Sequence, residues 1–562
     1  MKKRFFAMIL AVLLTVTALP LLASAESTPA SGTMDALSWT FNSAAGKLTI
    51  TGSGAMKNYN GSSQKSPFYG HSDIRTVEIG YGVTSVGDYA FYGCGQLRNI
   101  SLPEETMETI GKSAFEGNTQ LEAILIPSGV ETLGENCFRD CAALATVGMG
   151  SGVRTIKAGA FRGCTKLWDV YVEGGEEFFD TLHVSDNNEP LQNSNPITEC
   201  EFGRCGETQI WFYDGVDKTL TVLGEGEMEE FDYDMNPAPF SYLEAKKAVI
   251  GKSVGSVSDW AFYDLPDLEE ISVEAGSTYL TVENRALYDA KKTRLIAFPN
   301  KSNAVTLRIP EGVTEIAPGA AGNAKKLFQV FVPKSMKTVG YGAFEYCEAL
   351  KEVYYTGTKL AWDKIGIGDA NDPLLNASRW YTIDSIMLSI AAPAAGETPI
   401  RTYIIPALEG KFLPYQVNGV SWTPDDATFQ NGKTYTVTFL VTAKEGYRMP
   451  AEAKDLAATV NGKPALCRLV EIQTGAVKRI CAEVSFTFPT LQEFMLGDVD
   501  NDTKITASDA RLALRRAVDL ETYAPGSREF RACDVDKDGS VTANDARSIL
   551  RAAVDLEDPA AW

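Results

Sequence analysis

Histidine is scarce in this sequence, since only His71 and His183 occur among 562 residues. Catalytic triads that need histidine and zinc sites rich in histidine are therefore not expected, although chemistry carried by carboxylates alone stays open. A Cys-X-X-Cys pair, a glycine-rich phosphate loop of the right length and a nucleophile elbow are also missing from the sequence. These absences remove the commonest signatures of redox, phosphoryl-transfer and hydrolase sites.

Positive charge is also in short supply. The chain has 52 Lys and Arg residues against 73 Asp and Glu residues, which leaves a formal charge of −21. Nucleic acids and anionic membranes bind proteins through Lys and Arg side chains that neutralise phosphates. We therefore expect no nucleic acid partner, and a chain of this length has room for about three or four domains.

Long apolar runs are rare, and only Phe5–Leu22 approaches the length of a membrane-spanning helix. This run follows the basic residues Lys2–Arg4 and precedes Ala23-Ser24-Ala25. That order is typical of a secretory signal peptide, so we expect residues 1–25 to be removed after Ala25; an uncleaved membrane anchor is the alternative. We expect a secreted, extracellular protein without a direct membrane span, held to any surface by a partner.

The ten cysteines indicate packing more than a disulfide framework. Four of them follow a phenylalanine by three residues: Cys94, Cys141, Cys164 and Cys347. Cys137 stands directly before Phe138, and all five are expected to be small buried hydrophobes. In an exported chain two further pairs are candidate bridges, whose geometry a sequence does not test: Cys200 with Cys205, and Cys467 with Cys481.

From about residue 83 to residue 172 the sequence repeats itself every 23 or 24 residues. A small residue followed by a phenylalanine recurs at Phe91, Phe115, Phe138 and Phe161, with an aliphatic residue five before and a leucine six after each. No single unit buries its apolar side, so neighbouring units must stack into one continuous core. The pattern predicts a leucine-rich solenoid. It resembles BspA-type leucine-rich repeats, which are found in secreted and surface bacterial proteins and act as recognition scaffolds.

The solenoid pattern occurs twice. Trp39 and the strand after it return 172 residues later at Trp211, and the segment around Asn188 returns 183 residues later around Asn371. Each copy thus has an N-terminal hairpin, a stack and a C-terminal segment, as repeat arrays need caps on their exposed ends. We expect two modules, at 35–195 and 206–378. In the second, Ala320-Ala321 replaces a phenylalanine and 279–299 resembles an extra hairpin.

Between 383 and 490 the pattern changes to alternating strands separated by turn signals such as Asn-Gly. Many short strands at this spacing predict an immunoglobulin-like β-sandwich of about 100 residues. It could be a spacer, or it could bind sugar through exposed aromatic side chains. Trp422 and Tyr447 are the candidates for sugar contact, and core packing explains each of them equally well.

Two acidic loops of twelve residues stand near the C-terminus, 36 residues apart. Oxygen-bearing side chains occupy loop positions 1, 3, 5, 9 and 12 in both: Asp498, Asp500, Asp502, Thr506 and Asp509, then Asp534, Asp536, Asp538, Thr542 and Asp545. This spacing wraps a hard cation such as calcium, with the position-7 carbonyls of Lys504 and Ser540 as further ligands. Carboxylates this close repel one another without a cation between them. An exposed acidic turn is the alternative, but two loops in register favour two Ca²⁺ sites.

The segment after each loop is repeated as well, so the helix pattern starting at Ala510 returns at Ala546. Three residues at helical spacing form its apolar stripe, with Arg511 and Arg515 exposed: Ala510, Leu514 and Ala517. No matching helix is expected before the first loop, because the segment 494–497 is short and ends in glycine. The unit is therefore a duplicated loop followed by a helix.

This duplicated unit resembles a dockerin, closest to the type I kind, over about residues 494–562. The resemblance implies that the module plugs an extracellular protein into a cohesin domain of a scaffolding protein, with Thr506 and Thr542 binding calcium through water. Family positions that contact the cohesin fall on Ala507, Ser508, Leu514 and Arg515, and on Ala543, Asn544, Leu550 and Arg551. The first loop has Thr503 where the tight turn favours glycine, which could weaken that site by roughly 1 kcal/mol.

Together these patterns predict a mainly β chain: two solenoids, a sandwich and a small helical calcium module. No stretch of about 200 residues is left for a catalytic domain, so we expect a non-catalytic recognition or adhesion protein of a cellulosome-like assembly. The ligand of the solenoids stays open between glycan, host protein and bacterial surface. The alternative is a polysaccharide-degrading enzyme or a carbohydrate-binding accessory protein of the same assembly, and a structural spacer is a third option.

Overall fold

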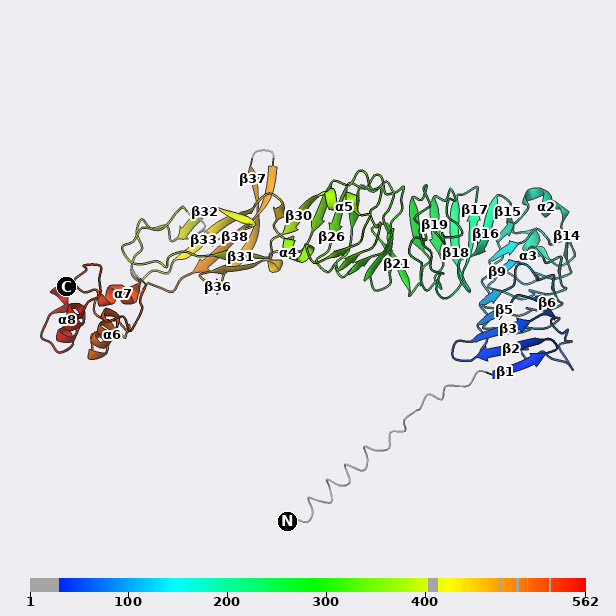
Figure 1. Ribbon diagram of the computed structural model, residues 1–562, viewed down its shortest axis with the longest axis horizontal. Helices are drawn as coiled ribbons and strands as arrows, with labels where there is room; N and C mark the ends of the chain where they lie inside the picture. The colour runs from blue at the N-terminus through cyan, green and yellow to red at the C-terminus, as the bar shows by residue number, and fades with distance from the viewer. Residues whose placement is uncertain are drawn as a thin grey trace, which may run out of the picture. The chain divides into compact units, whose positions relative to one another are not determined.

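The computed structural model describes residues 30–402, 413–474, 477–491, 495–502, 504–524 and 527–561. They form two compact units. One comprises the described residues up to Glu352 together with Ile365–Ala377, and the other comprises Val353–Lys364 together with the described residues from Ser378 onward. Strands predominate and helices are few, as the sequence predicts (Figure 1). The signal peptide expected at residues 1–25 lies outside the described residues. The boundaries of the four modules that follow it stay predictions.

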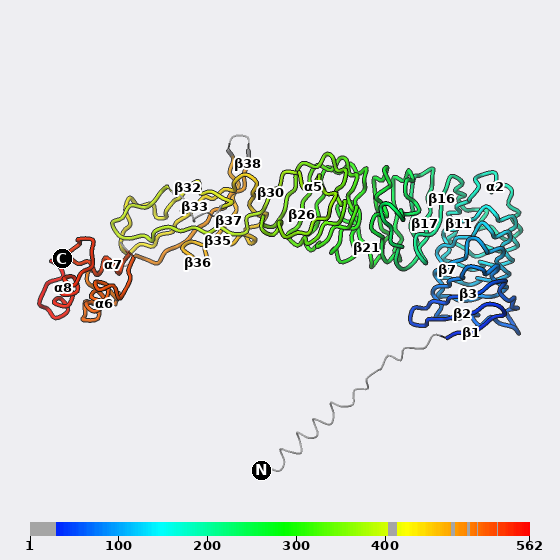
Figure 2. Tube along the Cα trace, viewed as in Figure 1, coloured from blue at the N-terminus to red at the C-terminus, as the bar shows by residue number. Residues whose placement is uncertain are grey.

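The first repeat array begins with an antiparallel meander and continues as parallel strands. One sheet has the order β1-β2-β3-β5-β7, with β1 (Ala30–Met34), β2 (Leu37–Asn42), β3 (Lys47–Gly52), β5 (Thr76–Ile79) and β7 (Asn99–Ser101). A second sheet is parallel throughout, with β4 (Gly54–Ala55), β6 (Val83–Val86), β8 (Thr109–Ile110), β10 (Thr132–Leu133), β12 (Thr155–Ile156) and β14 (His183–Val184). A third contains β9 (Ala123–Ile126), β11 (Thr146–Met149), β13 (Asp169–Val172) and β15 (Asn195–Ile197). The successive turns of this coil can be followed along the tube in Figure 2.

The core of this array is a column of phenylalanines. Phe91, Phe115, Phe138 and Phe161 are fully buried, and the ring centroids of successive members lie 5.3 to 5.5 Å apart in stacked pairs. The backbone N–H of each of the first three donates to the carbonyl directly before the next phenylalanine, as from Phe91 to Ala114 at 2.8 Å. Each buried ring stabilises the fold by about 2–3 kcal/mol. The predicted solenoid and its repeat frame are confirmed.

The five repeat cysteines are buried, as expected, and four of them also donate hydrogen bonds: Cys94, Cys141, Cys164 and Cys347. The Cys94 thiol donates to the Phe68 carbonyl at 3.1 Å, and the Cys164 thiol donates in the same way to the Phe138 carbonyl at 3.1 Å. Neither candidate disulfide is present, because all ten cysteines are free thiols. On the paired strands Cys467 lies opposite Val484 and Cys481 lies opposite Val470, so the two thiols are offset along the hairpin. Cys200 and Cys205 likewise remain unbridged.

A buried asparagine ends the ladder of each array. The Asn188 side chain accepts a hydrogen bond from the Phe161 N–H at 3.0 Å and donates to the Lys157 carbonyl at 3.0 Å. Asn371 does the same for the Phe344 N–H at 2.9 Å and the Gly340 carbonyl at 2.8 Å. Each amide thus replaces backbone groups that a next repeat would supply, because buried N–H groups need partners. This explains physically why both asparagines recur in the duplicated segment.

The second array repeats this plan. Its first sheet is β16-β17-β18-β19-β20, with β16 (Cys200–Arg204), β17 (Ile210–Asp214), β18 (Thr219–Leu223), β19 (Lys247–Ile250) and β20 (Glu270–Val273). The extra hairpin is confirmed and joins the second sheet, which contains β21 (Leu280–Glu283), β22 (Ala286–Asp289), β23 (Arg294–Ala297), β25 (Glu315–Ile316), β27 (Thr338–Val339) and β29 (Gly366–Ile367). A third set of strands includes β24 (Thr306–Arg308) and β26 (Gln329–Val332). The N–H of Phe298 donates to the Ala320 carbonyl, so this residue takes a ladder position that the repeat pattern does not reveal.

Short helices lie in the C-terminal segments of both copies. The first copy has α2 (Gly175–Thr181) and α3 (Glu189–Gln192). The matching segment of the second has α4 (Lys359–Trp362) and α5 (Asp372–Asn376), after β28 (Glu352–Tyr355). In the unit that contains the C-terminus, β30 (Ser378–Thr382) pairs in parallel with β34 (Tyr447–Arg448).

Two sheets sharing one core follow. One contains β31 (Ser385–Leu388), β35 (Ala457–Val460) and β36 (Lys463–Pro464); the other contains β32 (Tyr415–Thr423), β33 (Thr436–Ala443), β38 (Val477–Thr487) and β37 (Leu466–Thr474), with a short η1 (Ala453–Asp455) nearby. The two-sheet arrangement is the expected one, but β31 and β35 are parallel, and an immunoglobulin-like topology is not shown. Trp422 is buried and its indole N–H donates to the Ile400 carbonyl at 2.9 Å, so it serves packing and does not face a sugar.

Candidate calcium and docking site

Three helices form the core of the C-terminal module: α6 (Ala507–Ala517), α7 (Arg528–Cys533) and α8 (Ala543–Ala553), followed by η2 (Pro559–Ala561). Ala510 and Ala513 of α6 pack with Ala546 and Ile549 of α8 in one apolar cluster. The predicted stripe is therefore shifted around the helix, since Leu514 is exposed and Ala513 takes its place in the core. Arg511 and Arg515 are exposed, as expected.

Helix α7 is a feature that the sequence analysis missed. Its six residues carry no repeated helical stripe, but Ser527 caps its start, where the Ser527 hydroxyl oxygen accepts the Phe530 N–H at 3.1 Å. Its Arg528 guanidinium donates to the backbone carbonyls of Asp498 at 2.8 Å and Val499 at 3.1 Å. The second acidic loop thus has a helix on both sides, and α7 also holds the start of the first loop. The serine cap was the available signal.

Both long helices start with the same capping box. The Thr506 hydroxyl oxygen accepts the Ser508 N–H at 3.1 Å, and the same hydroxyl donates to Oδ2 of Asp509 at 2.9 Å. Thr542 and Asp545 repeat this arrangement at the start of α8. Such caps satisfy backbone N–H groups that the first helical turn leaves unpaired. The threonines therefore have a helix-capping role, while their water-mediated contact with calcium stays a prediction.

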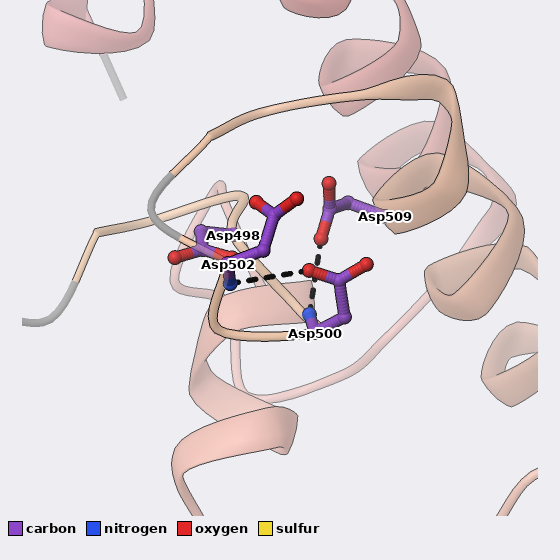
Figure 3. A group of neighbouring side chains, drawn as sticks. All are labelled: Asp498, Asp500, Asp502 and Asp509. Atoms are coloured by element: carbon purple, nitrogen blue, oxygen red, sulfur yellow. Dashed lines mark hydrogen bonds between the residues drawn. The ribbon is translucent and has the colours of Figure 1, made fainter.

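The first acidic loop gathers four carboxylates. Oxygens of Asp498, Asp500, Asp502 and Asp509 all lie within 4.8 Å of one another, and Figure 3 shows the four groups facing a common space. Asp498 and Asp509 are buried, whereas Asp500 and Asp502 are exposed. Asp509 comes from the first turn of α6 and the other three come from the loop. Loop positions 1, 3, 5 and 12 are thus brought together as the spacing predicts.

Backbone hydrogen bonds fix the shape of this loop. The Asp502 N–H donates to Oδ1 of Asp498 at 3.1 Å, and the Lys504 N–H donates to Oδ1 of Asp502 at 2.9 Å. The Asp509 Oδ1 atom accepts the N–H groups of Val499 at 2.7 Å and Asp500 at 3.0 Å. Since each carboxylate oxygen has more than one lone pair, these contacts hold the oxygens in place without using up their capacity as ligands.

The electrostatics of the loop favour a cation. Although the Asp500 side chain is exposed, partial desolvation of its carboxyl by the loop raises its pKa, and the carboxylates of Asp509, Asp502 and Asp498 raise this pKa further. The pKa rises because like charges at this separation disfavour the ionised form. A hard divalent cation removes that cost, and carboxylate oxygens are the donors that calcium takes. The residues present therefore fit calcium.

The second loop is similar but not identical. Carboxylate oxygens of Asp534, Asp536 and Asp538 lie within 4.8 Å of one another, whereas Asp545 does not belong to that group. Asp545 accepts the Val535 N–H at 3.0 Å through Oδ1, as Asp509 accepts Val499. Gly539 has φ +84°, the left-handed conformation that glycine adopts most readily. Thr503, its counterpart in the first loop, lies outside the described residues. The Ser540 N–H donates to Asp538 at 2.8 Å, as Lys504 does to Asp502.

The residues expected to contact a cohesin lie in matching places on the two helices. Leu514 and Leu550 are each 46 % exposed, and Arg515 and Arg551 are exposed beside them. Arg515 pairs with Glu521 at 3.0 Å, and Arg551 pairs with Glu557 at 3.1 Å. The helix starts carry the other four: Ala507, Ala543 and Asn544 are exposed, and Ser508 is half-buried. The two faces are thus near copies of each other.

Comparison with known families agrees with this geometry. Residues 496–552 match the dockerin type I domain. The C-terminal module is a type I dockerin. Residues 62–182 and 234–360 match the BspA-type leucine-rich repeat region, in six copies. The two arrays therefore consist of BspA-type repeats, and both modules found in the chain are of non-catalytic kinds. No curated protein matches the sequence.

Three solved structures illustrate the likeness of the arrays. A leucine-rich repeat protein from Eubacterium ventriosum is 16% identical over 65% of this chain and 81% of its own, with a TM-score of 0.22. A leucine-rich cell surface protein from Faecalibacterium prausnitzii is 18% identical over 61% of this chain and 99% of its own, with a TM-score of 0.19. A leucine-rich repeat protein from Bacteroides ovatus is 17% identical over 60% of this chain and 98% of its own, with a TM-score of 0.20.

None of the helices in the described part of the chain has the length and apolar character that a membrane crossing requires.

Proposed function

We propose that this protein is an exported, non-catalytic recognition protein that docks through its dockerin onto a cohesin of a cellulosome-like scaffold. The observation that carries the proposal is the pair of near-identical helix faces, each placed directly after an acidic loop suited to calcium. On this proposal the protein reaches the cell surface by binding the scaffold. The leucine-rich arrays then present the surface that meets a ligand outside the cell.

Each acidic loop has a definite part in this docking. We propose that Asp498, Asp500, Asp502 and Asp509 hold one Ca²⁺ ion, and that Asp534, Asp536, Asp538 and Asp545 hold the other. The bound ions supply positive charge that neutralises the clustered carboxylates. Because Asp509 and Asp545 also cap α6 and α8, ordering of the loops sets the start of both helices. The exposed side chains at the helix surfaces are thereby fixed in position for a partner.

Titration of the whole protein against purified cohesins tests the docking proposal. Calorimetry in calcium is expected to give tight binding of one cohesin per chain. The same titration in EDTA is expected to show a large loss of affinity, because the loops then lack the charge that holds them together. Tight binding that is unchanged in EDTA would contradict the calcium-dependent mechanism. Absence of binding to every cohesin of the producing bacterium would remove the scaffold proposal itself.

A carbohydrate-binding accessory protein of the same assembly is the second candidate. Exposed aromatic side chains on the second array favour it. A polymer-degrading enzyme is the third, and a screen of the purified protein on plant polysaccharides and starch separates the two. Release of reducing sugar would support an enzyme, whereas binding without release would support the accessory role.

A further inference from the structure

The second array carries a cluster of exposed aromatic side chains that the docking function does not use. The four residues Tyr233, Trp260, Tyr341 and Tyr346 are called the aromatic platform below. Tyr341 is 51% exposed and Tyr346 is 50% exposed, while Trp260 is half-buried. A fifth ring, that of the buried Tyr263, lies beneath them and contacts Trp260 and Tyr233. All of these residues belong to the same compact unit. Exposed apolar groups gathered in one place usually mark a binding surface.

The fold builds this platform with glycines. Trp260 and Tyr263 flank Phe262 in one repeat, and in a later repeat the corresponding positions are Gly319 and Gly322. A Cβ atom on Gly319 would lie 2.4 Å from the Trp260 ring, and one on Gly322 would lie 2.3 Å from the Tyr263 ring. The two rings therefore lie directly on the backbone of that repeat. Only glycine at both positions leaves room for them.

The rings form a packed set and not a cage. The ring centroids of Trp260 and Tyr263 are 4.9 Å apart, those of Tyr233 and Tyr263 are 5.5 Å apart, and those of Tyr233 and Trp260 are 5.8 Å apart. A cage for an ammonium group needs space for the cation against several ring faces at once. Rings in mutual contact leave no such space between them. The planes of these three rings are inclined to one another by 51° to 82°, so the platform is not flat, and each exposed ring can stack on a different ring of a partner.

Hydrogen-bond acceptors border the rings. The Tyr263 hydroxyl donates to Oε2 of Glu345 at 2.9 Å, which holds the ring and the carboxylate in place. Asp232 and Asp234 flank Tyr233 in the sequence, and their carboxylates add negative charge beside the ring. The border is thus acidic. An anionic ligand is excluded by repulsion, whereas hydroxyl groups can donate strong hydrogen bonds to carboxylates.

Two carboxylates near the platform are already engaged with neutral donors. Glu345 accepts the Tyr263 hydroxyl, and Asp232 accepts the N–H groups of Asp234, Met235 and Asn236. These contacts fix both carboxylates in place and leave each with lone pairs that can accept further donors. A partner for this surface therefore needs a face that stacks on aromatic rings and hydroxyl groups that donate to carboxylates. A pyranose ring meets both requirements, because its C–H face stacks on the negative face of an aromatic ring and its rim carries hydroxyls.

We propose that the aromatic platform binds a neutral polysaccharide chain, with sugar rings stacked on Tyr341, Tyr346 and Trp260. This rests on the proposed function of the arrays as the ligand-recognising part, and it gives their ligand a chemical class. It does not depend on the dockerin. The scaffold would bring the protein to its site, and the platform would hold the polymer.

Affinity electrophoresis of the whole protein tests this inference. The probes are mixed-linkage β-glucan, xyloglucan and galactomannan as neutral polymers, and polygalacturonate as an anionic polymer. We expect retardation by at least one neutral polymer, none by polygalacturonate, and little change in 0.5 M NaCl, since salt screens charge and not stacking. The double variant Y341A/Y346A is expected to weaken binding at least about 10-fold, which corresponds to about 1.4 kcal/mol.

A matched control and a second readout make the outcomes distinct. Tyr81→Ala removes a tyrosine of the first array that is still more exposed than Tyr341 and Tyr346, and it is expected to leave binding unchanged. Circular dichroism checks that the variants fold, and cohesin titration of Y341A/Y346A is expected to match that of the unaltered protein. Retardation by no neutral polymer, or equal retardation of Y341A/Y346A, would overturn the inference. So would salt-sensitive binding to polylysine alone, which would identify a basic partner. If the unaltered protein binds a neutral polymer but no cohesin, that result would instead count against the docking proposal.

Discussion

The Asp509 carboxylate, which is fully buried, accepts the backbone N–H of Val499 at 2.7 Å. The two residues lie at opposite ends of the first acidic loop, so this hydrogen bond closes the loop onto the start of α6. Asp545 and Val535 repeat the relationship at 3.0 Å in the second loop. One carboxylate therefore caps the helix, closes the loop by a hydrogen bond and is an expected calcium ligand. This shared use is why loop and helix are expected to order together.

Replacement of Asp509 by alanine is expected to remove all three roles at once. Loss of the cap alone costs about 1 kcal/mol of helix stability. We expect lower helicity by circular dichroism in calcium, and calorimetry that detects one calcium ion per chain where the unaltered protein binds two. Asp555→Asn is the control, because Asp555 is exposed after α8 at φ 57°, a conformation that asparagine tolerates. Two ions bound by Asp509→Ala would refute the assignment of Asp509 as a ligand.

Calcium affinity is expected to fall as the pH falls. The pKa values of Asp500 and Asp534 are raised mainly by desolvation, so protons compete with calcium at a higher pH than for an ordinary aspartate. The stability of the ion-free module is expected to change with pH in the opposite direction to calcium affinity. A carboxyl whose folded-state pKa is raised favours the folded state below its unfolded-state pKa, and that contribution is lost as the pH rises through the folded-state pKa. Calorimetric titration with calcium at several pH values between neutral and about 4.5 measures the first effect, and thermal melts in EDTA measure the second. An affinity independent of pH would contradict the prediction.

Both helix faces are expected to support cohesin binding in alternative orientations. Reversal of charge at Arg511 and Arg515 alone should be tolerated, because Arg547 and Arg551 offer a second face. Reversal at all four positions should cost at least about 10-fold more in affinity, or about 1.4 kcal/mol. Calorimetry with one cohesin compares the two variants. An equal loss from the two-residue and four-residue changes would show that only one face is used.

The repeat thiols are expected to resist alkylation in the folded protein. Burial raises the pKa of Cys94, Cys164 and Cys347 to about 12, and only the thiolate reacts. Mass spectrometry after iodoacetamide treatment at pH 8 should find these three unmodified until denaturant is added. Cys467, which is partly exposed, is the internal comparison and should react first. Rapid modification of these three repeat thiols in the native protein would contradict their burial in the core of the arrays.

Replacement of Asn371 by alanine is expected to loosen the end of the second array. The change leaves the buried Phe344 N–H without a partner, at a cost of about 1–3 kcal/mol, whereas the Gly340 carbonyl keeps the Ala343 N–H at 3.4 Å. Hydrogen exchange should increase at the Phe344 amide and around it. Asn193→Ala, at an exposed asparagine of the first array, should leave exchange at the Phe344 amide unaltered. Unchanged exchange in Asn371→Ala would show that water replaces the amide.

Most of the architecture could be predicted because it is local and periodic. The phenylalanines at intervals of 23 or 24 residues specify which side chains stack, and the two acidic loops specify where oxygens converge. Helix α7 was missed because six residues cannot display an apolar period. The burial of Ala513 in place of Leu514 was missed because spacing alone does not say which side of a helix meets its neighbour.

By itself the sequence determined the repeat frame, the expected calcium ligands and the duplicated dockerin faces, since all three depend on residue type at fixed intervals. Only the tertiary structure decided that Asn188 and Asn371 end the ladders, that no cysteine is bridged, and that Trp260 lies against Gly319. Those outcomes depend on tertiary contacts between residues that are far apart in the sequence. The spacing of residues along the chain does not say which of them come into contact in the folded protein.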